Sequence, residues 1–165
     1  MKTKILLILS LFLGVFTALN SEVNKAPLPK LKIPGKELPK AQEQQMYRFA
    51  ALTIYHYPKT IPRVFASGFV PPNSLTTHST EYTGRYFTPS EVSVIYLTTL
   101  TNEYLNLYYK TFLEVQDLRI LQKEEKDKQT TLLLETRTKK LITIQMQEKK
   151  KYTRVKLFYR NTTSY

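Results

Sequence analysis

The chain contains no cysteine and no tryptophan, and only four of its 165 residues are glycine. Without cysteine the protein can form no disulfide, no thiolate nucleophile and no zinc–thiolate site, and it cannot be acylated as a lipoprotein. Gly35, Gly68 and Gly84 have neither the spacing of a phosphate-binding loop nor that of a serine nucleophile elbow. These absences exclude several common enzyme signatures and leave core packing as the source of stability.

Acidic residues are also scarce, with 13 Asp and Glu against 25 Lys and Arg, for a net charge of +12. This imbalance favours anionic partners, among which are acidic proteins, acidic lipid headgroups, acidic glycans and nucleic acid. The charge alone does not choose among these classes. The chain also has 12 tyrosines and 8 phenylalanines, whose large side chains suit a core edge or an interface.

One long uncharged stretch, Ile5–Leu19, follows Lys2 and Lys4. A basic start and an apolar run shorter than the ~20 residues of a membrane span are typical of a secretory signal peptide. We therefore predict a signal peptide over residues 1–20 and export to the periplasm or cell envelope. Secretion beyond the envelope and an uncleaved N-terminal membrane anchor are the alternatives. Residues 21–40 are rich in proline and lysine and predict a solvated linker, followed by a single domain over residues 41–165.

The first half of this domain has mixed signals. Residues 41–55 have apolar side chains at helical spacing and predict a short N-terminal amphipathic helix. Residues 58–73 contain four prolines and a glycine and predict an irregular loop, and residues 75–82 predict an edge strand. Residues 88–91 match a helix capping box, but residues 92–100 are rich in β-branched side chains, so we favour a strand there over a helix.

The second half has clearer patterns. Residues 102–114 predict a helix that Thr101 or Asn102 caps. Four β-like segments follow at 118–123, 130–136, 141–147 and 152–159, and the short charged turns between them indicate antiparallel pairing. Alternating side chains give the sheet one apolar and one polar face. The predicted fold is α+β: an antiparallel sheet of four or five strands with one main helix packed on one face, plus the short N-terminal helix.

The second half resembles a class of small exported bacterial α+β domains that carries no family name. The resemblance rests on the Tyr108-Tyr109 step within the helix, the short strand Asp117-Leu118-Arg119-Ile120-Leu121 after it, and the charged-loop meander that follows. It covers residues 92–160. It implies a fold and an exported location, and it assigns no site residues.

The polar face of the last predicted strand is the strongest candidate site, because basic side chains and one aromatic alternate along it after a lysine-rich turn. The candidate binding residues are Lys149, Lys150, Lys151, Arg154, Lys156, Phe158 and Arg160. We therefore predict a non-enzymatic exported protein, an interaction or structural module, that docks on an acidic protein partner or an anionic envelope surface.

Two alternatives from other functional classes are kept. A polyanion-binding module for nucleic acid or acidic glycan would use the same alternation of basic and aromatic side chains. Nucleic acid is not expected, because the aromatic–glycine pattern of sheet-type RNA binders is absent and an exported protein rarely meets it. A hydrolase would need His56 or His78 beside a carboxylate, and neither has an adjacent one in the sequence. No metal site and no cofactor are predicted.

Overall fold

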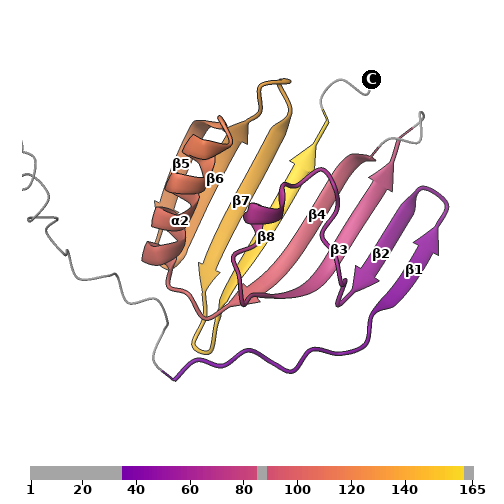
Figure 1. Cartoon of the computed structure of the whole chain (residues 1–165), viewed down its shortest axis with the longest axis horizontal. Helices are drawn as coiled ribbons and strands as arrows, with labels where there is room; N and C mark the ends of the chain where they lie inside the picture. The colour runs from indigo at the N-terminus through magenta and orange to yellow at the C-terminus, as the bar shows by residue number, and fades with distance from the viewer. Residues whose placement is uncertain (1–34, 85–88, 162–165) are drawn as a thin grey trace, which may run out of the picture.

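A computed structural model describes residues 35–84 and 89–161 of the chain, so the predicted signal peptide lies outside the described residues (Figure 1). The strands form one antiparallel sheet in the order β1-β2-β3-β4-β8-β7-β6-β5. One α-helix and one 3-10 turn lie side by side against one face of this sheet. No helix in the described ranges combines the length and the apolar character that a bilayer span requires.

The chain makes two four-stranded meanders with the helix between them. The strands and helices are β1 Gln45–Phe49, β2 Leu52–His56, η1 Ser67–Phe69, β3 Leu75–Thr83, β4 Pro89–Thr98, α2 Asn102–Val115, β5 Arg119–Lys126, β6 Gln129–Glu135, β7 Leu141–Glu148 and β8 Thr153–Arg160. The predicted helix at 102–114 and the predicted strand at 92–100 are both confirmed. At α2, the Thr101 hydroxyl accepts from the Tyr104 N–H, as expected of an N-cap residue.

The predicted N-terminal helix is wrong, because residues 45–56 form the β1–β2 hairpin. Phe49 pairs with Leu52 across a two-residue turn in which Ala50 takes a positive φ of 33°. An Asn-Gly or Asp-Gly pair is the usual sequence signal for such a turn. Because this turn has neither pair, sequence patterns did not indicate the hairpin. The aromatic and β-branched residues of this segment, such as Tyr47 and Ile54, fit the paired strands better than a helix.

The predicted sheet of four or five strands is also wrong, since the described residues form eight. β3 is not an edge strand, because it pairs with β2 on one side and β4 on the other. β8 lies between β4 and β7 and joins the two meanders into one sheet, with Glu91 opposite Arg160 and Thr98 opposite Thr153. These pairings connect residues far apart in sequence, which alternation within single strands does not reveal.

The core lies between the sheet and the layer formed by α2 and η1. Alternate residues of β8, Val155, Leu157 and Tyr159, are buried there, as are Leu105, Tyr109 and Leu113 of α2. Their spacing of two in the strand and about four in the helix is what directs each set to one side. The opposite face of the sheet is covered by no other described element, and we call it the open face.

A chain of tyrosine hydroxyls ties the helix to the sheet and to the η1 turn. Tyr109 of α2 donates a hydrogen bond to the Phe69 carbonyl oxygen at 2.8 Å. Since its only hydrogen is used there, its oxygen accepts the hydrogen bond of 2.5 Å from the Tyr96 hydroxyl. Both side chains are fully buried, and burial raises the pKa of each, that of Tyr96 well above 10, so both stay protonated.

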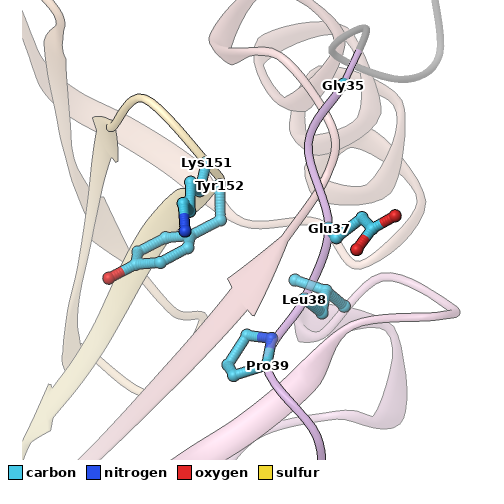
Figure 2. Close-up of a pocket in the computed structure, with 6 residues that line it drawn as sticks. All are labelled: Gly35, Glu37, Leu38, Pro39, Lys151 and Tyr152. Atoms are coloured by element: carbon cyan, nitrogen blue, oxygen red, sulfur yellow. The ribbon is translucent and has the colours of Figure 1, made fainter.

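Residues 35–44 run along one end of the sheet before entering β1, and we call them the strap (Figure 1). The strap begins beside the β7–β8 turn, where Lys36 Nζ lies 3.2 Å from a carboxylate oxygen of Glu148 and only 6 % of the Lys36 side chain is exposed. Gly35, Leu38 and Pro39 face Tyr152 across a pocket of about 310 Å³ (Figure 2). Of the predicted linker, residues 21–34 lie outside the described ranges, and residues 35–39 lie against the end of β7 and the β7–β8 turn.

Candidate functional site

The open face carries the basic residues of β8. Arg154, Lys156 and Phe158 alternate with the buried residues of the same strand, and the two basic side chains are exposed. β8 is an inner strand with neighbours on both sides, so its open-face side chains stand near the middle of the open face. This placement agrees with the predicted polar face of the last strand.

The strand register brings both histidines to the same surface. His56 of β2 lies directly opposite His78 of β3, and the two ring centroids are 4.5 Å apart, edge to face. Continuing across the sheet, His78 is opposite Ile95 of β4 and Ile95 is opposite Lys156 of β8. We call His56, His78, Arg154 and Lys156 the basic cluster.

The electrostatics of this cluster favour an anion. The pKa of His78 is lowered by partial burial, by the neighbouring His56 and by Arg154, so its neutral form is favoured in the absence of a ligand. Within the described parts of the chain, no carboxylate lies within 4 Å of Arg154 or Lys156. A negative group placed here would contact cations without displacing an internal partner.

A β-bulge lies next to the histidine pair. The register between β3 and β4 shifts between Thr76 and His78, and the intervening Thr77 donates its hydroxyl hydrogen to the Ile95 carbonyl oxygen at 3.2 Å. Bulges bend a strand and increase its twist, and they are common beside functional sites. The bulge therefore helps set the direction of the His78 imidazole on the open face.

The other predicted site residues lie in two places. Lys149, Lys150 and Lys151 form the exposed turn between β7 and β8, at the same end of the sheet as Arg154 and beside the strap. Arg160 lies at the opposite end of β8, where its guanidinium is 3.5 Å from Glu91. The structure thus brings the lysine turn toward the basic cluster and places Arg160 apart from it, beside an acidic side chain.

Aromatic side chains border the basic cluster. The Tyr47 ring of β1 contacts the His56 ring with centroids 5.5 Å apart, and Tyr47 is 45 % exposed. Phe158 is partly exposed on the open face of β8, two residues beyond Lys156. An aromatic and basic surface of this kind can offer both charge and flat apolar contact to a partner.

Sequence patterns missed the histidine pair and Tyr47. Both histidines were visible as residues, but their contact depends on the register of β2 against β3 and on the existence of the β1–β2 hairpin. Residues 75–82 offered one signal, because alternation along a strand places His78 on the same face as Thr80.

The hydrolase alternative named His56 and His78 as its candidate bases. The imidazoles of His56 and His78 contact each other, and the groups that perturb the pKa of His78 are His56 and Arg154, neither of which is acidic. Ser79 and Glu81 line a small pocket of about 200 Å³ on the helix side of β3. His78 points to the opposite face from its neighbour Ser79, so it cannot serve that hydroxyl as a base.

No family model matches the chain, and neither a curated protein nor a solved structure matches it.

Proposed function

We propose that this protein is a non-enzymatic exported module that docks on an acidic protein surface through the open face of its sheet. The single observation that carries the proposal is the basic cluster, in which Arg154 and Lys156 are exposed on an inner strand and no described carboxylate pairs with either. Export rests on the uncharged stretch Ile5–Leu19 after two lysines.

A protein partner suits this surface better than a polyanion. The cluster is compact, and apolar or aromatic side chains such as Ile95, Tyr47 and Phe158 lie among or beside its charges. Protein interfaces combine aromatic and arginine anchors with a few charge contacts in this way. A polyanion-binding module would use a longer cationic track, and its affinity would fall steeply with salt.

The test measures binding of a synthetic aspartate-rich peptide by fluorescence anisotropy at constant ionic strength. Reversing two charges in Arg154→Glu/Lys156→Glu should weaken binding by about tenfold, because partly exposed ion pairs contribute about 0.2–1 kcal/mol each and reversal adds repulsion. The matched control is Lys110→Glu/Lys128→Glu, which makes the same change in net charge at exposed positions outside the open face. The control should change affinity by less than about twofold.

Each outcome decides between the classes. Equal weakening by both double variants would show that total charge, and not the open face, drives binding, and the docking site would be wrong. Heparin or vesicles of anionic phospholipid that bind more tightly than the peptide, with a steep salt dependence, would instead support the polyanion module or the anionic envelope surface. Circular dichroism of each variant checks that the sheet is retained.

A further inference from the structure

We propose that the His56–His78 pair is a pH-sensitive carboxylate subsite, so that docking of an acidic segment strengthens as the pH falls from about 7.5 to 5.5. This inference rests on the proposed docking function and names the group that the basic cluster receives. Its geometric basis is the direct cross-strand contact of the two imidazoles on the open face, with Lys156 of β8 in the same register across β4.

The pair lacks a negative neighbour on every strand around it. On the β1 side, Gln45 is opposite His56 and the Tyr47 ring contacts the His56 imidazole. On β4, the residue opposite His78 is Ile95. On β8, the charged open-face residues at this end of the sheet are Arg154 and Lys156. Among the described strand residues that these pairings and contacts place around the pair, the ionisable ones are therefore cationic or phenolic.

This arrangement couples proton uptake to anion binding. In the free protein, burial, His56 and Arg154 hold the pKa of His78 below its ordinary value. A carboxylate that enters the cluster offsets the repulsion from Arg154 and favours the protonated imidazole. Since the ligand raises the proton affinity of His78, protonation must by linkage raise the affinity for the ligand.

The pH range of 7.5 to 5.5 is set by the different ordinary pKa values of aspartate and histidine side chains. Aspartate side chains have ordinary pKa values near 4 and stay ionised at pH 5.5, whereas histidine titrates near 6.5. Between pH 7.5 and pH 5.5 the acidic ligand keeps its negative charge, while the histidine pair that receives it gains a positive charge. Uptake of a single proton can strengthen binding by at most about tenfold per pH unit, so we expect about three- to tenfold tighter binding at pH 5.5 than at pH 7.5.

The experiment compares peptide affinity at pH 7.5 and 5.5 for the wild-type protein, for His56→Gln/His78→Gln and for Arg154→Gln. The histidine variant should bind with the same affinity at pH 7.5 and at pH 5.5, because glutamine keeps hydrogen-bonding capacity without a titratable charge. Arg154→Gln should bind more weakly at both values.

The outcomes separate the two proposals. Wild-type affinity that is equal at both pH values, together with weakening by Arg154→Gln, would overturn the pH-sensitive subsite and keep the docking function. Peptide binding that neither variant alters would overturn both. NMR titration of the His78 imidazole gives a second measurement that needs no variant, because its pKa should rise when the peptide is added; an unchanged pKa would also overturn the subsite.

Discussion

Removing single hydroxyl groups from the buried tyrosine chain should have unequal effects on stability. In Tyr109→Phe, the Tyr96 hydroxyl loses its acceptor and the Phe69 carbonyl loses its donor. Each buried polar group left without a partner costs about 1–3 kcal/mol, so the two together should cost about 2–6 kcal/mol. Tyr96→Phe removes only a donor, and Tyr109 still donates to Phe69, so its cost should be about 0.5–1.5 kcal/mol.

The double variant gives the sharper test of this reasoning. In Tyr96→Phe/Tyr109→Phe only the Phe69 carbonyl remains without its partner, because the unsatisfied Tyr96 hydroxyl is also gone. Its cost should therefore fall short of the sum of the single costs by about 1.5–4.5 kcal/mol, because the double variant avoids both the unpartnered Tyr96 hydroxyl and the separate cost of Tyr96→Phe. The double variant can even be more stable than Tyr109→Phe alone.

Urea unfolding followed by far-UV circular dichroism measures these differences directly. Tyr108→Phe is the matched control, because the Tyr108 hydroxyl donates to the Gly68 carbonyl at 2.8 Å from a side chain that is only partly buried. Water can replace that bond, and a loss of about 0.5 kcal/mol is expected. Equal costs for Tyr96→Phe and Tyr109→Phe, or strict additivity in the double variant, would refute the direction of hydrogen bonding described above.

Two further predictions concern close packing and pH. Gly68→Ala should lower Tm by about 5–10 °C, because an added Cβ would overlap the Phe112 ring, which is held against Phe69 with ring centroids 5.0 Å apart. Thermal melts of Gly68→Ala and of the exposed control Ser67→Ala measure this effect, and equal Tm values for the two variants would contradict it. Stability should also fall between pH 7 and pH 5.5, because His78 has a lowered pKa in the folded state, so the unfolded chain binds more protons below pH 6.5. Urea unfolding at both pH values should show a smaller difference for His78→Gln than for the wild type, and identical differences would argue against the lowered pKa.

Local patterns in the sequence predicted the second half of the fold well. The helix at 102–114 was predictable because its apolar residues, such as Leu105 and Tyr109, recur at helical spacing after a capping residue. The faces of β7 and β8 were predictable because buried residues alternate with polar ones. Both signals are local and need no knowledge of neighbouring elements.

Pairing between distant strands was not predictable, and the site depends on it. Nothing in the residues of β8 indicates that β4 is its neighbour, and the hairpin at 45–56 turns at two alanines without a glycine. The candidate basic residues Arg154 and Lys156 could be predicted from alternation alone. Their association with His56 and His78 could not, because it depends on the registers of three strand pairs at once.

The central position of β8 also constrains how the chain can acquire its structure during synthesis. β8 is the last of the eight described strands to leave the ribosome. Until it does, β4 and β7 each have one unpaired edge, and the two half-sheets that end in them are not joined by β8. Such edges readily pair with other chains. Completing the sheet over such long sequence separations is slow, so a nascent chain stays unfolded for longer than one built from local contacts. If the chain is exported as we propose, this delay would keep it competent for passage through a translocation channel and postpone the final fold until it has crossed.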